Sequence, residues 1–500
     1  MSSQSKKVIV IGAGFAGLSA ASFLAQKGWD VTIIEKHELP GGRARKFKEK
    51  GFTFDMGPSW YWMPDIFERY FNSFGKKVSD YYSLKRLDPS YRVYFEKEGW
   101  DIPANYNELQ NLLESVEPGA AKALDAFMAE AKFKYDVGVG KLVHNPGLSL
   151  TEFLDMDLVK GVFKLDVFQS MKKHVAKFFK HPAIQSLMEF PVLFLGALPE
   201  KTPALYSLMN YADIKGGTWY PEFGMYSIVQ AMYDLATSLG VQFKLGEEVT
   251  SIEVVSGKAI AVHTLKNATG EKQQYTMDVL IGAGDYHHIE TKLLAPAYQS
   301  YSSAYWDTRV MAPSSLLYYI GLNKKLEGVL HHQLFFDTDF GLHGHEIYSD
   351  PKWPTRPLFY ASVPSVTDPT VAPEGCENLF LLIPIAAGLE GDTEDIRDQY
   401  FEMIIQRFEE RIGQSIRDAI VYKRSFAVKE FKEEYHSFRG NAYGLANTLL
   451  QTANLKPSCK SKKVNNLYYT GQLTVPGPGV PPSLISGEVV AKLVDQKHKG

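Results

Sequence analysis

Cysteine is nearly absent from this 500-residue chain, which contains only Cys376 and Cys459. Two cysteines cannot build a disulfide framework, and these two show no metal-ligand spacing, so we predict no metal site and a reducing cytoplasm as the location. The chain also lacks a large excess of charge of either sign. It contains 54 Lys and Arg residues and 57 Asp and Glu residues, which give a net charge of −3. Such a balance gives no bulk attraction to nucleic acid, and no nucleic-acid partner is expected.

A long uncharged apolar run is missing as well, with one apparent exception near the start. Residues 8–25 are 18 uncharged residues that follow Lys6 and Lys7, a pattern that superficially resembles a signal anchor. Three glycines interrupt the stretch and argue against a membrane span. No repeat or low-complexity segment stands out. A chain of this length can bury a large core and is expected to hold at least two domains.

The start of the chain carries the most specific pattern. Residues 8–11 predict an apolar strand that runs into the turn Gly12-Ala13-Gly14-Phe15-Ala16-Gly17, and a second strand at residues 31–34 ends at Glu35. In such a turn the first glycine permits the bend, the second admits a phosphate and the third lets the helix pack on the strand. The pyrophosphate lies at the helix N-terminus, and the acid binds a ribose hydroxyl. The sequence therefore predicts a bound dinucleotide.

The following turn favours FAD over NAD as that dinucleotide. Residues 41–45, with the sequence GGRAR, come after the ribose acid and present backbone N–H groups and the guanidinium of Arg43. These groups suit a second set of phosphate oxygens, as in a large dinucleotide that is held extended and permanently. A solvated basic turn is the alternative explanation.

The middle and the end of the chain predict an α/β fold with α+β insertions. Helices are expected at residues 107–134, 150–210, 223–239, 394–412 and 484–495, and strands at residues 241–244, 249–255, 259–265, 274–277, 278–284, 316–322, 379–385 and 466–471. Pro481 and Pro482 are placed to open the last helix. A helix N-terminus at this point directs its positive end toward an electron-rich ring edge.

Both ends of the chain are therefore expected to build one nucleotide site. We predict a Rossmann-like FAD-binding domain from residues 1–90, 224–295 and 440–500. An inserted substrate-binding domain of mixed sheet plus helices is expected from residues 91–223 and 296–439.

Several motifs together resemble the bacterial-type phytoene desaturases, a family of FAD-dependent carotenoid desaturases related to the flavin amine oxidases. They are the glycine turn, GGRAR at 41–45, DMGPSW at 55–60, GTWYP at 217–221, EV at 248–249 and TGQLTVPGPGVPPSLISG at 470–487. The resemblance covers nearly the whole chain and is strongest to Bacteroidetes members. It implies an oxidoreductase of CH–CH groups that introduces C=C bonds into a linear or partly modified carotene. A carotenoid 3,4-desaturase of a hydroxylated or monocyclic carotene, and a flavin amine or porphyrinogen oxidase, remain alternatives.

The resemblance also implies roles for individual residues. The FAD-binding set that it implies is Gly12, Ala13, Gly14, Phe15, Ala16, Gly17, Glu35, Lys36, Gly42, Arg43, Ala44, Pro58, Ser59, Trp60, Val249, Gly284, Gly471, Gln472, Gly479, Val480, Pro481 and Ser483.

Near the flavin, the resemblance implies Trp219 and Tyr220 as packing walls and Asp368 as a polar group. Asp368 precedes a proline, however, and a turn former is the alternative explanation. Phe223, with Trp219 and Phe194, is expected to contact substrate, because Phe223 stands where the family usually has a glycine. His287 and His288 are expected at the surface.

A carotenoid substrate implies contact with a membrane. Residues 164–180 have apolar side chains on one helical face and Lys172, Lys173, Lys177 and Lys180 on another. Such a helix can lie in a bilayer interface, or it can be an ordinary surface helix with its apolar face in the core. We expect the helical part at about residues 105–210 to associate peripherally with the inner face of the cell membrane. The expected electron acceptor is oxygen or a quinone.

Overall fold

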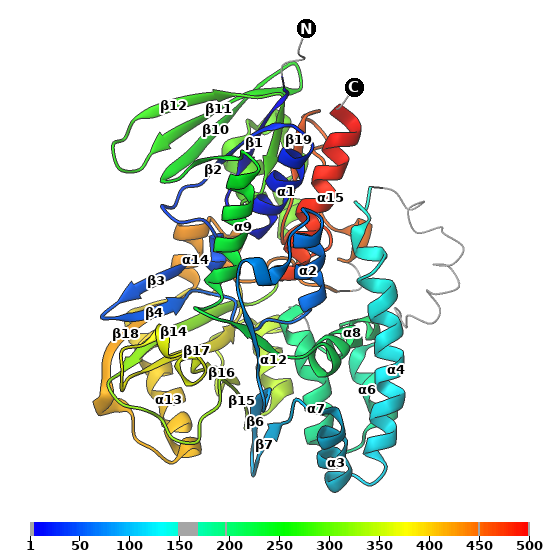
Figure 1. Ribbon diagram of the computed structural model, residues 1–500, viewed down its shortest axis with the longest axis vertical. Helices are drawn as coiled ribbons and strands as arrows, with labels where there is room; N and C mark the ends of the chain where they lie inside the picture. The colour runs from blue at the N-terminus through cyan, green and yellow to red at the C-terminus, as the bar shows by residue number, and fades with distance from the viewer. Residues whose placement is uncertain (1–4, 149–168, 196–197, 449–450, 499–500) are drawn as a thin grey trace.

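The computed structural model describes residues 5–148, 169–195, 198–448 and 451–498, except for the side chains of residues 193–195 and 453. At one end lies a five-stranded parallel sheet with the order β19-β13-β1-β2-β9 (Figure 1). Its strands are β1 (Lys7–Ile11), β2 (Asp30–Ile34), β9 (Gln242–Lys244), β13 (Val279–Gly282) and β19 (Leu467–Tyr469). Segments from the start, the middle and the end of the chain therefore share one sheet.

Three helices pack around this parallel sheet, namely α1 (Phe15–Gln26), α9 (Tyr226–Ser238) and α15 (Val480–His498). Helix α15 begins four residues earlier than expected, with Pro481 and Pro482 in its first turn. Helices α1 and α15 lie side by side, and the Ser19 hydroxyl donates to the carbonyl of Leu484 at 2.7 Å. The two ends of the chain are thus held together directly.

An antiparallel three-stranded sheet extends the nucleotide-binding end of the molecule (Figure 1). It contains β10 (Glu247–Val255), β11 (Lys258–Lys266) and β12 (Lys272–Thr276). The expected strands fall on these three, because turn residues at 256–257 and 267–270 separate alternating patterns.

A seven-stranded mixed sheet forms the centre of the other half, with the order β18-β14-β17-β16-β15-β6-β7. Its strands are β6 (Tyr91–Phe95), β7 (Gly99–Ile102), β14 (Ser314–Leu322), β15 (His332–Phe336), β16 (Phe359–Ser362), β17 (Glu377–Ile385) and β18 (Ile420–Phe426). Alternate residues of β14, such as Leu316 and Tyr318, pack on α13 (Glu394–Ile412). The intervening residues, such as Leu317, face the opposite way, toward a large cavity.

Short elements connect these sheets. The strand pairs are β3 (Lys46–Glu49) with β4 (Phe52–Asp55), and β5 (Leu84–Arg86) with β8 (Trp219–Pro221). Further helices are α2 (Pro64–Asn72), α10 (Tyr286–His288), α11 (Ser303–Asp307), α12 (Phe340–Tyr348) and α14 (Val428–Tyr435).

A helical region flanks the central sheet (Figure 1) and contains α3 (Tyr106–Val116), α4 (Ala120–Gly138), α6 (Met171–Phe178), α7 (Pro182–Glu189) and α8 (Leu208–Tyr211). The single helix expected at residues 107–134 is in fact two. Glu117 is extended before Pro118, and Gly119 has a φ of +93°. Proline disfavours helical geometry in the preceding residue, and glycine permits the positive φ, so the chain turns between α3 and α4.

The apolar face of α6 corrects one expectation about membrane contact. Met171, Val175 and Phe179 are fully buried in the main hydrophobic core, while the four lysines from Lys172 to Lys180 are exposed. The apolar face is therefore used for packing and is not available to a bilayer. Val167 and Phe168 lie outside the described residues. Among those residues no helix is both long and apolar enough to span a membrane.

Candidate FAD and substrate site

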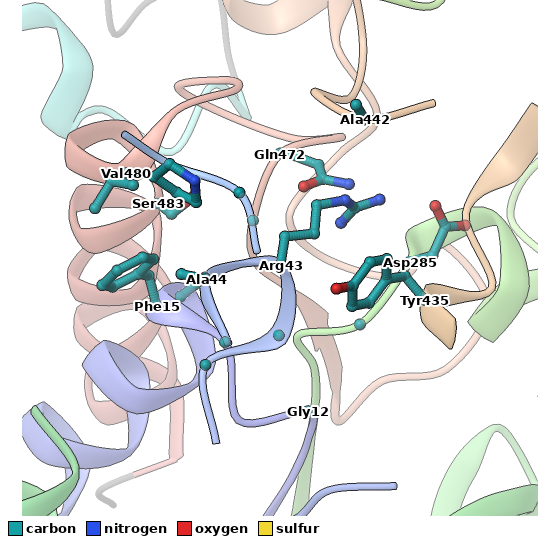
Figure 2. Close-up of a pocket in the computed structure, with 18 of the residues that line it drawn as sticks. Gly12, Phe15, Arg43, Ala44, Asp285, Tyr435, Ala442, Gln472, Val480 and Ser483 are labelled. Atoms are coloured by element: carbon teal, nitrogen blue, oxygen red, sulfur yellow. The ribbon is translucent and has the colours of Figure 1, made fainter. Parts of the chain in front are cut away.

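A cavity of about 430 Å³ lies where the parallel sheet, the central sheet and the start of α15 meet. It is lined by all of the predicted FAD-binding residues except Ala13 and Gly17. Figure 2 shows Phe15, Ala44, Val480 and Ser483 grouped at one side of this space. Residues that are more than 450 positions apart in the sequence therefore border one site.

The glycine turn between β1 and α1 has the geometry that a pyrophosphate requires. Gly12 has a φ of +103°, which permits the sharp bend. A Cβ atom on Gly17 would lie 2.1 Å from the carbonyl oxygen of Gly12, so Gly17 serves close packing of helix on strand. A Cβ atom on Gly14 would meet nothing within 4 Å and would enter the cavity. The open side of Gly14 is thus the place where a phosphate can approach the backbone.

The carboxylate of Glu35, which directly follows β2, is held in place by backbone N–H groups. Its Oε2 accepts the N–H of Ala13 at 2.8 Å, and its Oε1 accepts the N–H of His37 at 3.0 Å. Burial raises the pKa of the Glu35 carboxyl, against the two amide hydrogen bonds, which lower it. Each oxygen keeps a second lone pair, so the carboxylate can also accept hydrogen bonds from ribose hydroxyls.

Arg43 points across the cavity from the GGRAR turn, between Gln472 and the side chains of Tyr435 and Asp285 (Figure 2). One terminal nitrogen donates to the Ser437 hydroxyl, while the buried Nε has no hydrogen-bond partner. Burial lowers the pKa of Arg43, and the nearby Asp285 carboxylate opposes that shift. An unpaired guanidinium N–H inside a cavity is costly unless a ligand accepts from it, so this donor fits an FAD oxygen or ring nitrogen.

Helix α14 contributes site residues that the sequence did not reveal. Its end, with Glu434, Tyr435 and His436, lines the cavity although residues 296–439 were assigned to the substrate domain. The His436 ring stacks on His288 with centroids 4.0 Å apart, and its Nε2 lies 2.7 Å from Glu248 Oε1.

His288 thus borders the cavity and is not the surface residue that was expected. Burial is the main cause that lowers its pKa to about 3, so the ring is neutral. Nothing in the local sequence distinguishes His288, or Glu434 to His436, from ordinary surface residues.

The three residues predicted to lie near the flavin do not line the cavity that is bordered by the predicted FAD-binding residues, and their roles stay predictions. Trp219, Tyr220 and Asp368 line neither described cavity. Tyr220 is buried and donates to Asp368 Oδ2 at 3.3 Å, while Asp368 Oδ1 accepts the backbone N–H of Thr370 at 2.9 Å. Asp368 therefore caps a short helical turn, which is the alternative that the proline after it suggested.

Among the described residues, the predicted substrate contacts likewise do not line these two cavities, and their roles stay predictions. Phe223 is 64% exposed, has a φ of +69° and borders neither described cavity, so its ring narrows neither of the two. Its N–H donates to Asp368 Oδ2 at 2.8 Å, which holds the turn before α9. Phe194 lies in a 3₁₀ helix (Phe190–Leu195), and its side chain is outside the described part of the structure.

A second, smaller cavity of about 70 Å³ lies under the central sheet against α12. Its lining is almost wholly apolar and includes Phe190, Phe336, Phe340 and Phe359. Three residues, Tyr360, Leu382 and Tyr443, line both cavities and therefore lie between them; we call these three residues the neck. The small cavity thus adjoins the large one and offers apolar space of the kind that suits part of a hydrocarbon chain.

Fold and cavity together define a flavoprotein oxidoreductase, with a dinucleotide fold joined to an apolar substrate region. Residues 15–494 match the model of the flavin containing amine oxidoreductase family. The chain is 41% identical over 488 residues to the carotenoid 3,4-desaturase of Haloarcula japonica, with 97% of each chain covered. It is 30% identical over 497 residues to the zeta-carotene-forming phytoene desaturase of Myxococcus xanthus, which covers 98% of this chain and 94% of that one.

A crystal structure of an oxidoreductase from Methanosarcina mazei has the same fold, with a TM-score of 0.63 at 16% identity, and covers 97% of this chain and 100% of the other. This chain belongs to the FAD-dependent carotenoid desaturases of the flavin amine oxidoreductase family. The predicted cofactor, fold class and CH–CH oxidoreductase activity are confirmed. The exact domain boundaries and the residue-level roles stay predictions.

Proposed function

We propose that the enzyme introduces a double bond near the end of a carotenoid chain, as a 3,4-type desaturase. The observation that carries this proposal is the 41% identity to the Haloarcula japonica carotenoid 3,4-desaturase, against 30% to the phytoene desaturase. The 70 Å³ cavity beyond the neck suits the end of a chain better than its middle. Desaturation of linear phytoene at several positions is the second candidate, supported by the full-length match to the phytoene desaturase.

Polar residues around the neck favour a carotene that carries a hydroxyl group near its end. The hydroxyl-bearing residues Ser59 and Ser315 line the large cavity, and Tyr443 lines both. In an otherwise apolar path these groups can hydrogen-bond a hydroxyl on the carotene. A hydroxylated linear or monocyclic carotene is therefore the form of substrate that we propose.

The protein's own residues bind and orient the reactants and exclude water from them. FAD, when bound, supplies hydride acceptance from the substrate carbon. Gly14, Glu35 and Arg43 hold the dinucleotide, and the neck residues fix which carbon–carbon bond lies in the large cavity. The apolar lining of the smaller cavity excludes water from the chain end that lies in it. Oxygen or a quinone is proposed as the final electron acceptor.

Product analysis separates the two candidate reactions. We expect co-expression with a pathway that makes hydroxylated lycopene derivatives to yield a product that lacks two hydrogens at the 3,4 position, identified by chromatography and mass spectrometry. Co-expression with phytoene alone is expected to leave phytoene unchanged. Conversion of phytoene to coloured products would instead support the second candidate.

We propose that the protein associates peripherally with the inner face of the cell membrane and takes its substrate from that membrane. The support is an apolar substrate together with the exposed lysines of α6, which can attract anionic head groups. Because the apolar face of α6 is buried, the attraction is electrostatic and not insertion of this helix.

Charge reversal of α6 is expected to weaken vesicle binding. Each exposed lysine near an anionic surface contributes about 1 kcal/mol, so Lys173→Glu with Lys177→Glu should lower affinity for phosphatidylglycerol vesicles roughly tenfold or more. Sedimentation at low salt measures the change. The matched control, Lys258→Glu with Lys272→Glu, reverses two exposed lysines on the three-stranded sheet. Equal sedimentation of both variants and the parent would remove α6 from the membrane-facing surface.

A further inference from the structure

The neck between the two cavities contains a hydroxyl bound to a base. Tyr360 on β16 lines both cavities, and its hydroxyl lies 2.6 Å from Nδ1 of His332 on the neighbouring strand β15. His332 is fully buried, and its ring stacks on Trp60 at 4.1 Å with an interplanar angle of 11°. Its Nε2 has no hydrogen-bond partner. The pair is therefore a titratable unit that includes a residue lining both cavities.

Both members of this pair are neutral at rest. Burial raises the pKa of the Tyr360 phenol, although Ser59 and Ser362 hydrogen-bond to it and lower it. Burial also holds the pKa of His332 far below its ordinary value, helped by the adjacent His331. A neutral phenol beside a neutral imidazole can pass its proton inward and receive another from outside.

We propose that Tyr360 accepts the proton that desaturation releases, while its own proton moves to Nδ1 of His332. The proposal rests on the proposed desaturase function. The substrate loses one hydrogen with its bonding pair, as a hydride, to bound FAD. The second hydrogen leaves the neighbouring carbon as a proton, its bonding pair becomes the second bond of the new C=C, and the proton binds the Tyr360 oxygen. The substrate is oxidised by two electrons and FAD is reduced by two.

Among the acids and histidines that line the two described cavities, none is placed for this role. His343 lines the small cavity, but its Nε2 pairs with the Pro384 carbonyl at 2.9 Å and its Nδ1 accepts the Leu358 N–H at 3.0 Å. The remaining lining acids and histidines belong to the nucleotide end, namely Glu35, His37, Glu247, Glu248, Asp285, His288, Glu434 and His436.

A weakly basic pair is sufficient because the substrate cation that it deprotonates is a strong acid. A carbon that has lost a hydride next to a polyene becomes a delocalised cation, which is a far stronger acid than an imidazolium. The imidazolium that forms at His332 lies against the face of Trp60, and an indole face attracts a cation.

Tyr360→Phe tests the proposal with the FAD-loaded enzyme. We expect turnover of whichever substrate the parent desaturates, a hydroxylated lycopene derivative or phytoene, to fall about a hundredfold, the scale of general acid–base catalysis. FAD content and carotenoid affinity, measured by quenching of tryptophan fluorescence, should change less than threefold. The matched control is Tyr319→Phe, which loses a buried hydroxyl that donates to the Met56 carbonyl at 2.8 Å outside both cavities. His332→Phe keeps a ring beside Trp60 and should slow turnover as Tyr360→Phe does.

Deuterium at each carbon of the new double bond distinguishes proton transfer from a packing defect. In Tyr360→Phe the isotope effect should rise at the carbon that loses a proton and fall at the carbon that loses a hydride. Turnover within threefold of the parent, or isotope effects that do not move, would overturn the proposal. Failure of the parent to desaturate both the hydroxylated lycopene derivative and phytoene would overturn the proposed function itself, and the proton-transfer proposal with it.

Discussion

We expect Gly14→Val to give a folded but colourless protein. A Cβ atom on Gly14 meets no protein atom within 4 Å, and the backbone there has a φ of −75° that valine adopts without strain. The valine side chain therefore does not disturb the apoprotein, but it occupies the space through which the pyrophosphate approaches the turn. Crowding of this kind costs about 3 kcal/mol, which is roughly a hundredfold in FAD affinity. Flavin absorbance of the purified protein and an FAD titration measure the loss.

Gly216→Val is the matched control for this substitution. Gly216 lies outside both cavities, and the nearest atom to an added Cβ is the Tyr211 carbonyl oxygen at 3.9 Å. The control should purify yellow with a normal FAD affinity. A yellow Gly14→Val protein with full flavin content would show that the pyrophosphate does not lie against this turn.

The sequence predicted those parts of the fold that repeat a strong local pattern. The helix at 394–412 has the observed bounds, because an acidic first turn, capped by Thr393, and Gly413 mark its two ends. The C-terminal helix was predicted from Pro481 and Pro482, and only its start was placed too late. The FAD-binding turns were predictable because each depends on glycines that no other residue can replace.

Residues whose roles depend on distant parts of the chain were not predictable. The end of α14 lines the FAD cavity with Glu434, Tyr435 and His436. This contact depends on how α14 packs in the tertiary structure, and no local sequence pattern predicts it. The neck is similar, since Tyr360 and His332 pair across adjacent strands after a long connection. Tyr220 was assigned to the flavin and Phe223 to the substrate by resemblance alone, and in the structure both hydrogen-bond to Asp368 and line neither described cavity.

Gly487→Ala is expected to destabilise the fold itself. Gly487 lies on α15 against α1, and an added Cβ atom would lie 2.5 Å from the Ala16 carbonyl oxygen and 2.7 Å from the Ala20 nitrogen. Both are backbone atoms and cannot rotate away, so the two helices must separate. Overpacking at such a contact costs about 3 kcal/mol. Urea-induced unfolding should shift to lower urea, whereas Gly216→Ala, at an open position, should leave the transition within error of the parent.

This substitution also separates packing glycines from cofactor glycines. The first turn of α15 lines the FAD cavity with Val480, Pro481 and Ser483, so movement of α15 away from α1 widens the site and weakens FAD binding as well. Gly487→Ala should therefore lose stability and FAD affinity together, with excess FAD restoring part of the lost stability by mass action. Gly14→Val should lose FAD affinity alone, and the same concentration of FAD should stabilise it much less than it stabilises the parent. An unchanged unfolding transition for Gly487→Ala would mean that α1 and α15 are not in close contact, and the shared nucleotide site built from the two chain ends would have to be redrawn.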